Sequence, residues 1–146
     1  MTDIRIPRAK WIKLGEDLCE KIRKRTKKGK GLESDFEDYT PKYRAKKVAG
    51  KFKRQSSTSS KPDLNLTGDM MRDLQVRGAN RESVQIGWTG AFARRVVHNA
   101  EAGREITRSK KALSTELENY TLKEVKRLFN KELDKNFNKT THIKIK

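Results

Sequence analysis

The sequence has few of the residues that build disulfide-bonded or membrane-spanning proteins. Its 146 residues include one cysteine, three prolines and 7% aromatic residues. The single cysteine, Cys19, has no disulfide partner within the chain, so the sequence is compatible with a reducing compartment. Because no run of about 18 apolar residues occurs, we expect no transmembrane helix. The first residues also lack the apolar segment of a signal peptide.

Apolar residues are scarce as well. Hydrophobic types make up 33% of the chain and charged types 38%. A globular chain of this length buries roughly 68–70% of the surface that its unfolded form exposes. The length suits a single domain over residues 1–146. Its core is expected to be thin, so we expect partner molecules to order part of the chain.

Positive charge is abundant instead. The 36 Lys and Arg oppose 19 Asp and Glu, which gives a formal net charge of +17. Residues 21–30 carry seven basic side chains, residues 31–41 four acidic ones, and residues 42–54 seven basic ones. These 34 residues therefore hold ten of the seventeen net charges. The charge predicts an anionic partner, either nucleic acid or an acidic protein surface.

Hydrophobic spacing predicts a helix near each end of the chain. Over about Pro7–Arg25, apolar residues recur at three- and four-residue steps, at Trp11, Leu14, Leu18 and Ile22. Gly15 within this segment costs about 1 kcal/mol of helix propensity relative to Ala. Near the other end, Thr121–Glu124 matches a capping box and predicts a helix from there to about Phe137. Leu113 and Leu117 offer an alternative, earlier start.

Shorter elements are predicted between these helices. Gln75–Arg77 and Ser83–Gly87 are expected to form a hairpin whose turn is Gly78–Asn80, with Val84 and Ile86 on one face. Ala91–Ala100 is either a helix or a third strand. His142–Lys146 alternates like a terminal strand.

Residues 26–62 are predicted to form a long connection. A loop of this length is typically a binding arm or a disordered segment. Within it, Thr40 and Pro41 favour the start of a short helix. Gln55–Ser60 is polar and is predicted to be flexible.

The sequence contains no convincing catalytic or metal-binding set. His98 and His142 lack a second ligand at a useful spacing, and Cys19 is expected to be a buried, inert thiol. Gly87–Gly90 is not followed by the Lys-Ser/Thr of a phosphate loop. The acids of residues 31–41 lack the order and glycine of a calcium loop. We therefore expect no enzymatic activity, no cofactor and no metal.

Several segments follow one another in a recognisable order. Ile22–Lys30 reads I-R-x-R-T-x-x-G-K, Tyr39–Tyr43 reads Y-T-x-x-Y, and Asp63–Met70 reads D-L-x-L-T-G-x-M. A hairpin that ends in Ile-Gly and a C-terminal helix follow. Over about Trp11 to Leu133, this series resembles the phage virion-morphogenesis family of neck and tail-completion proteins. It departs from that family at Arg108–Ser114, which lacks a phenylalanine, and at the polar insert Gln55–Ser60.

The resemblance implies a small α+β protein. Its central antiparallel β-sheet would have an N-terminal and a C-terminal helix packed on it and a long basic arm, residues 26–62. It implies a structural virion protein of the neck or tail top, assembled in the host cytoplasm. Such proteins form a ring, commonly a hexamer, that joins the tail tube or sheath to portal, adaptor or stopper proteins. Tail terminator, completion factor and connector remain alternatives.

In this interpretation the arm contacts neighbouring subunits or rings. The residues expected at an oligomer or partner interface are Tyr39, Tyr43, Lys46, Lys47, Phe52, Lys53, Arg54 and Trp88. Those expected to face DNA in the channel, or an acidic surface, are Lys21, Arg23, Lys24, Arg25, Lys27, Lys28 and Lys30. Thr67 and Gly68 have a structural explanation as the cap and turn before a short helix over residues 69–73. Trp88 is either core or an interface anchor.

A second hypothesis is a basic nucleic-acid-binding protein that uses residues 21–54. The two basic runs suit phosphate backbones, although a solvated, charge-rich arm explains them equally well. Tyr39, Tyr43 and Phe52 interleave with the charges, but more sparsely than the aromatic platforms that stack single-stranded bases.

Overall fold

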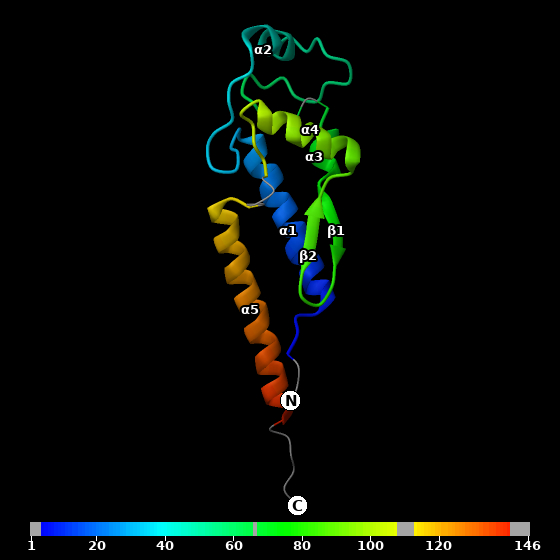
Figure 1. The fold of residues 1–146 in the computed structure, drawn as a ribbon, viewed down its shortest axis with the longest axis vertical. Coiled ribbons are helices and arrows are strands. Elements are labelled where there is room, and N and C mark those ends of the chain that lie inside the picture. Colours follow the sequence, from blue (N-terminus) through cyan, green and yellow to red (C-terminus); the bar gives the residue numbers. More distant parts are fainter. Residues whose placement is uncertain (1–3, 66, 108–112, 141–146) are drawn as a thin grey trace, which may run out of the picture.

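In the part of the chain that the structure describes, five helices and a β-hairpin are arranged along one long axis. The computed structural model describes residues 4–65, 67–107 and 113–140. The elements are α1 (Arg8–Lys27), α2 (Pro41–Val48), α3 (Asp69–Asp73), β1 (Gln75–Ala79), β2 (Val84–Gly87), α4 (Gly90–Glu101) and α5 (Thr115–Thr140). Helices α1 and α5 run side by side, the hairpin packs on another side of α1, and α2 lies at one end of the molecule (Figure 1). The predicted α+β class is confirmed.

The hairpin covers α1 with one apolar face. Strands β1 and β2 are antiparallel, with Val76 opposite Ile86 and an irregularity between Val76 and Gly78. Val84 and Ile86 lie against α1, whereas Gln85 points to the other side and is exposed. The predicted division of the two faces is therefore confirmed.

Gly15 is the point of closest approach between α1 and the hairpin. A Cβ built on Gly15 would lie 2.7 Å from the Cγ2 atoms of both Val76 and Val84. Glycine is the residue that fits at position 15 despite its lower helix propensity, because a side chain there would collide with the hairpin.

The hairpin turn lies two residues later than predicted. Strand β1 continues to Ala79, and the Asn80 Oδ1 atom accepts hydrogen bonds from the backbone N–H groups of Glu82 (2.7 Å) and Ser83 (2.8 Å). The predicted Gly78–Asn80 turn was wrong because an Asn side chain folds the chain over the residues that follow it. The predicted terminal strand His142–Lys146 lies outside the described residues.

The segment after the hairpin is helix α4, which settles the alternative left open by its sequence. Val96 is buried and Phe92 packs against the core, while Val97 is 60% exposed. One side of α4 therefore faces the body of the protein and the other faces solvent.

Helix α5 begins at Thr115, earlier than the predicted capping box. Thr121 lies inside the helix, where its hydroxyl donates to the Leu117 carbonyl (2.7 Å). Threonine can make this bond to the preceding turn anywhere in a helix, so the Thr121–Glu124 pattern did not mark an end. The capping box was wrong, and of the two residues that offered an earlier start, Leu117 lies in the helix whereas Leu113 precedes it.

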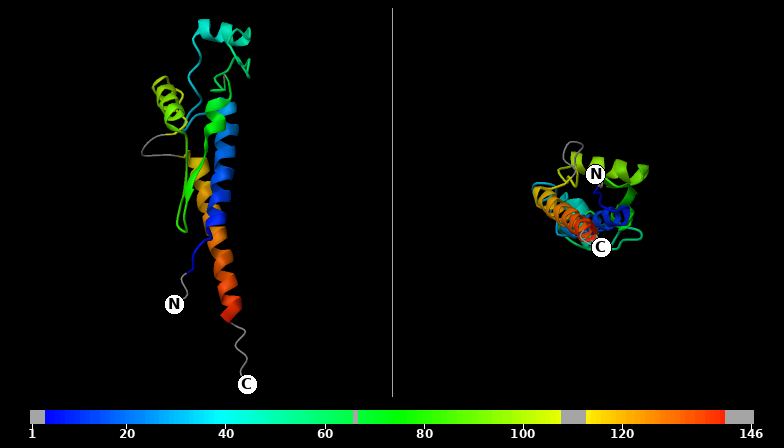
Figure 2. Two further views of the ribbon diagram at one scale, coloured as in Figure 1. Left: turned by 90° about the vertical axis from the view of Figure 1, so that its right-hand side faces the viewer. Right: turned by 90° about the horizontal axis from the view of Figure 1, so that it is seen from below.

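Helix α5 packs chiefly along α1 (Figure 2). Leu117 and Leu128 are buried in this contact region, and the Lys21 ammonium lies 4.3 Å from the centre of the Tyr120 ring. The sheet itself is in contact mainly with α1, so α1 is the central support of the fold.

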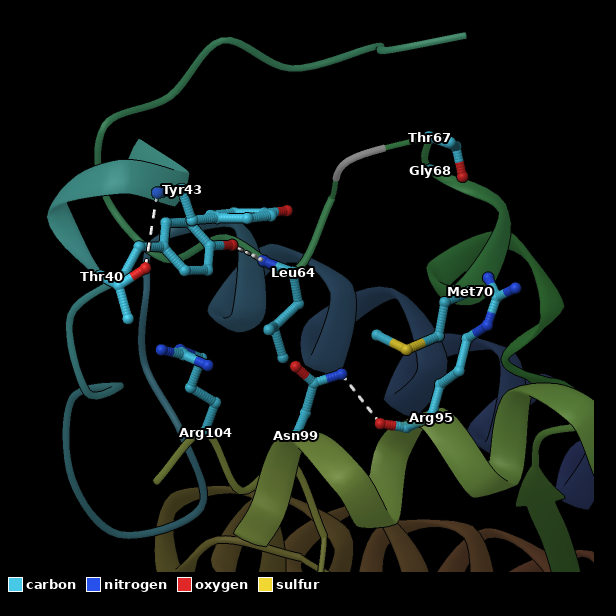
Figure 3. Close-up of a pocket in the computed structure, with 10 residues that line it drawn as sticks. Thr40, Tyr43, Leu64, Thr67, Gly68, Met70, Arg95, Asn99 and Arg104 are labelled. Carbon is cyan, nitrogen blue, oxygen red and sulfur yellow. Dashed lines mark hydrogen bonds between the residues drawn. The ribbon is translucent and has the colours of Figure 1, made fainter. Parts of the chain in front are cut away.

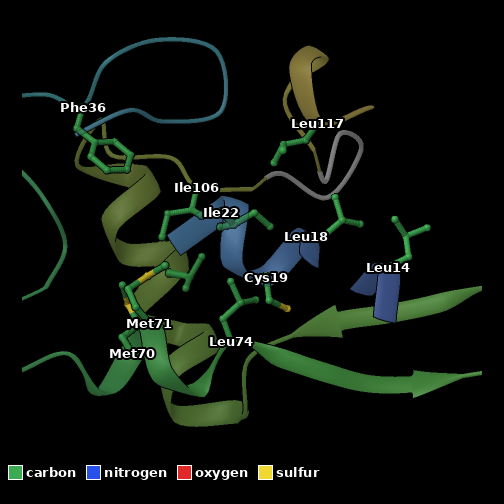
Figure 4. Packing of buried hydrophobic residues seen from close by; sticks show 11 residues of the cluster. Leu14, Leu18, Cys19, Ile22, Phe36, Met70, Met71, Leu74, Ile106 and Leu117 are labelled. Atoms are coloured by element: carbon green, nitrogen blue, oxygen red, sulfur yellow. The ribbon is translucent and has the colours of Figure 1, made fainter. Parts of the chain in front are cut away.

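The core forms where α1, α3, α4 and the start of α5 converge (Figure 4). Its buried members are Leu14, Leu18, Cys19, Ile22, Phe36, Met70, Met71, Leu74, Val96, Ile106 and Leu117. The predicted core role of Met70, Met71 and Leu74 is confirmed. This core lies beside one end of the hairpin, between the hairpin and α2 along the long axis (Figure 1).

Candidate functional site

A folded lobe occupies the end of the molecule where the sequence predicted an arm. We call residues 39–65 the tip lobe; it contains α2 and the loop that returns to the body. Helix α2 begins as predicted, with Pro41 in its first turn and the Tyr43 N–H donating to the Thr40 hydroxyl (3.4 Å). The rings of Tyr39, Tyr43 and Phe52 pack in series, with centroids 4.8 and 5.1 Å apart. The lobe therefore has an aromatic cluster of its own.

A buried ion pair holds the two halves of the tip lobe together. Lys47 is fully buried and its ammonium contacts the Asp63 carboxylate, itself 4% exposed. The same ammonium lies 3.5 Å from the Tyr39 hydroxyl. Asp63 also accepts hydrogen bonds from the Ser57 hydroxyl and the Asn65 N–H. Burial of two charges is tolerated only with such complete hydrogen bonding.

The polar insert Gln55–Ser60 is bonded into the lobe. The Gln55 side-chain amide donates to the carbonyls of Lys47 and Ser57, and its oxygen accepts from the Phe52 N–H (3.2 Å). These bonds close the loop over the end of α2. The sequence alone indicated a flexible stretch, because Gln55 bonds to backbone groups and such bonds leave no motif in the sequence.

Arg104 attaches the lobe to the body where the lobe begins, and the first and last segments of the lobe are bonded to each other. The Tyr39 hydroxyl accepts from the Leu64 N–H (3.3 Å), and the Arg104 guanidinium donates to the carbonyls of Glu37 (2.9 Å) and Asp38 (2.8 Å). Arg104 also lies 4.9 Å from the centre of the Tyr39 ring, a cation–π distance. The lobe is thus positioned on the body and not merely tethered to it.

A cleft of about 400 Å³ lies between the tip lobe and α4 (Figure 3). Its lining residues are Tyr39, Thr40, Tyr43, Leu64, Thr67, Gly68, Met70, Arg95, Asn99 and Arg104. Hydroxyl, amide and guanidinium groups therefore surround an apolar patch made by Leu64 and Met70. Burial raises the pKa of the Tyr43 hydroxyl. Such a lining suits polar contacts with a binding partner.

Two of the segments that carry the family resemblance meet at this cleft. Tyr39–Tyr43 supplies one wall, and Asp63–Met70 supplies another. Gly68 has a φ of 78°, the left-handed conformation that glycine adopts without strain, and Thr67 accepts a hydrogen bond from the Asp69 N–H (3.4 Å). The turn predicted at Gly68 is confirmed, but the predicted cap was wrong, because Gly68 and not Thr67 is the N-cap of α3 and no side chain caps that helix.

The basic run at the end of α1 divides into internal and exposed side chains. Arg23 donates to the carbonyls of Met71 (2.8 Å) and Leu74, and Arg25 donates to the Ile106 carbonyl (3.0 Å). Burial lowers the pKa of Arg25. These two arginines secure the third segment of the resemblance, Ile22–Lys30, to the body.

The remaining members of that run lie at the surface. Lys24 is paired with Glu20 (2.6 Å) and Lys21 covers the Tyr120 ring, whereas Lys27, Lys28 and Lys30 are exposed. Only part of the predicted contact set is thus available to an anionic partner.

The predicted interface residues divide in the same way. Lys46, Lys53 and Arg54 are exposed, Tyr43 and Phe52 are half-buried in the aromatic cluster, and Tyr39 and Lys47 are buried. Lys47 and Tyr39 therefore hold the lobe together and do not present themselves to a partner. Sequence reasoning treated Lys47 as one charge among seven because Asp63, its partner, lies 16 residues away.

Trp88 is half-buried and packs against the core. Its indole N–H donates to the Met70 carbonyl (2.9 Å), so the side chain links the end of the hairpin to α3. Cys19 is buried, and desolvation raises the pKa of its thiol, as expected for an inert core cysteine. His98 is exposed and lies 3.7 Å from Glu101, while His142 falls outside the described residues.

Within the described ranges, no three His, Cys, Asp or Glu side chains gather closely enough to hold a metal ion. No helix in the part of the chain that the structure describes is long and apolar enough to cross a membrane. Comparisons with protein-family models, curated proteins and solved structures give no match.

Proposed function

We propose that this protein is a structural subunit of a phage head–tail junction that assembles into a ring. The resemblance of its ordered segments to neck and tail-completion proteins supplies the class. Support also comes from their placement, since Tyr39–Tyr43 and Asp63–Met70 meet at one cleft and Ile22–Lys30 is bonded to α3. Segments that form one contiguous unit are what a shared fold would require.

The observation that carries ring assembly is the exposed apolar face of α5. Leu122 is 59% exposed and Phe129 is 42% exposed, and their seven-residue spacing puts them on one side of the helix. A different side of the helix, with Leu117 and Leu128, is occupied by the body. A second copy of the chain would bury this exposed face, which gives the thin core additional apolar contact.

The hairpin offers a second place for contact between copies. Among the described residues its sheet has two strands, so each strand has one edge without a paired neighbour. Edge strands pair readily with further strands, and a closed ring of subunits removes such edges.

The test is the oligomeric state of the full chain. Light scattering with size-exclusion chromatography and electron microscopy should show a ring. Leu122→Ser with Phe129→Ser should give a folded, smaller species, because the apolar contact between copies is lost. Lys123→Ser with Lys131→Ser, exposed positions on other sides of the same helix, is the matched control and should still assemble. A wild-type chain that stays monomeric at high micromolar concentration contradicts the proposal.

The place in the virion needs its own measurement. Antibody labelling of phage particles should mark the neck, at the junction of head and tail. Labelling along the tail or on the capsid would contradict the assignment to the junction even if the protein forms rings.

A further inference from the structure

The tip lobe carries a dense cationic surface that its own acids do not neutralise. Eight of its 27 residues are Lys or Arg, and Asp63 is its one acid. The Asp63 carboxylate is paired with the buried Lys47, so it does not neutralise the exposed charges. The other seven basic residues are all exposed: Lys42, Arg44, Lys46, Lys51, Lys53, Arg54 and Lys61. Across the described residues, none of these seven is within ion-pair distance of a carboxylate.

The fold gathers these charges at one end of the molecule. Lys42 and Lys46 lie one turn apart on the same side of α2, and the Lys51 N–H donates to the Lys46 carbonyl (3.0 Å), which folds the loop back against that helix end. Lys27, at the exposed end of α1, shares a shallow hollow with Ser56 of the lobe. Lys27 therefore lies beside the lobe.

The composition of this surface favours a phosphate backbone over an acidic protein. Five of the seven exposed charges are lysines, a residue depleted in the cores of protein–protein interfaces. Lysine and arginine without interleaved acids are the groups that displace counterions from nucleic acids.

The packing of the aromatic cluster favours double-stranded over single-stranded nucleic acid as the ligand. Single-strand binding proteins offer exposed rings on which bases stack. Here Tyr39 is buried, and the rings of Tyr43 and Phe52 pack against each other at 5.1 Å. Because these rings pack against one another inside the lobe, the exposed charges are the groups that would contact a nucleic acid.

We propose that the tip lobe binds the phosphate backbone of duplex DNA without sequence preference. This binding site goes beyond ring assembly and does not depend on it. It also relocates the basic site from the whole of residues 21–54 to the exposed face of residues 39–65, because Arg23 and Arg25 serve the fold.

The experiment compares two variants that each remove three positive charges. Lys42→Gln, Lys46→Gln and Lys51→Gln removes charge from the lobe. Lys10→Gln, Arg81→Gln and Arg94→Gln removes the same charge from exposed positions of the body. Fluorescence anisotropy with a labelled duplex is measured between about 50 and 200 mM salt, where each phosphate contact contributes about −0.9 to the slope of log affinity against log salt.

The wild-type slope should approach about −6 if all seven cations contact phosphates, and the lobe variant should be shallower by about 2.7. Its affinity should fall at least about tenfold at intermediate salt, while the body variant stays within about twofold of wild type. Circular dichroism of both variants should match wild type, since all six side chains are exposed.

Three results would overturn the proposal. The first is an equal loss of duplex affinity in the lobe variant and the body variant, and the second is tighter binding to a single strand of the same sequence than to the duplex. The third is binding of poly-glutamate as tight as binding of the duplex, which would point to an acidic protein instead. Light scattering on the same samples keeps the two proposals separate. A monomer that binds duplex DNA refutes ring assembly alone, and a ring without DNA binding refutes this inference alone.

Discussion

Basic side chains in this protein have two distinct physical roles. Arg23 and Arg25 donate to backbone carbonyls of Met71, Leu74 and Ile106, and Lys47 neutralises Asp63 inside the tip lobe. These bonds supply partners to the backbone carbonyls, because an unpaired buried carbonyl costs free energy, while the Nε and Nη1 atoms of Arg25 are buried without a hydrogen bond among the described residues. The formal charge of +17 therefore overstates what the surface offers to a partner.

Asp73 is a residue through which pH should act on the fold. Its carboxylate accepts hydrogen bonds from the N–H (2.6 Å) and hydroxyl (3.0 Å) of Thr89, at the start of α4, and pairs with Arg77. The backbone bond from Thr89 is the main reason that the pKa of Asp73 is lowered, with Arg77 contributing. A lowered pKa in the folded state means that the stabilisation is present above the unfolded pKa of about 3.9 and is lost as the pH falls through the folded value.

Asp73→Asn should therefore be less stable than wild type at neutral pH, and the difference should close in acid. Urea unfolding at a series of pH values measures this, with the exposed Asp38→Asn as control. A stability gap that persists unchanged into strong acid would show that the charge of Asp73 is not what matters.

Elements were predictable from the sequence where local chemistry decides them. The α1 stripe, the Thr40–Pro41 start of α2 and the two hairpin faces follow from periodicity and capping, and the structure agrees. Thr121 and the hairpin turn were misplaced because side-chain bonds to the backbone, made by Thr121 and Asn80, override the pattern. The buried pair of Lys47 and Asp63 was not predictable, since a contact across 16 residues depends on the tertiary fold.

Gly15 tests how closely α1 and the hairpin pack. Gly15→Ala adds a methyl group 2.7 Å from Val76 and Val84, so overpacking should cost about 1–3 kcal/mol. Against this, alanine gains about 1 kcal/mol of helix propensity, so the net loss should be smaller than for a pure core clash. Denaturant unfolding measures the change.

A second substitution separates the clash from other effects of the added methyl group. Val84→Ala in the Gly15→Ala background should recover part of the loss, a non-additivity expected only for groups in contact. Lys10→Ala, on the exposed side of α1, is the control for propensity alone. A Gly15→Ala protein more stable than wild type would mean that α1 and the hairpin are not closely packed at this point.

At the scale of the whole molecule, the protein is a body that carries a lobe with internal contacts of its own, and Leu64 packs the lobe against the core. The eleven buried residues of the core all lie outside residues 39–65, and the lobe is held by its aromatic cluster and its buried ion pair. The molecule is elongated, and its two proposed contact surfaces lie in different elements: the exposed apolar side chains are on α5, and the exposed basic side chains are on the tip lobe (Figure 1). Stability of the lobe and stability of the body should therefore be separable.

Asp63→Asn should open the tip lobe while the body stays folded. Removing one partner of a buried ion pair costs about 3–5 kcal/mol, because the other charge is left buried without compensation. Hydrogen exchange should show lost protection of the α2 amides and retained protection in α1, and duplex binding should weaken with the loss of the ordered cationic surface. Lys47→Met with Asp63→Leu replaces the pair by apolar groups and should restore protection of α2, since such replacements are often neutral. Unchanged α2 protection in Asp63→Asn would show that the ion pair does not hold the lobe. Protection lost from α1 as well would show that lobe and body unfold as one unit.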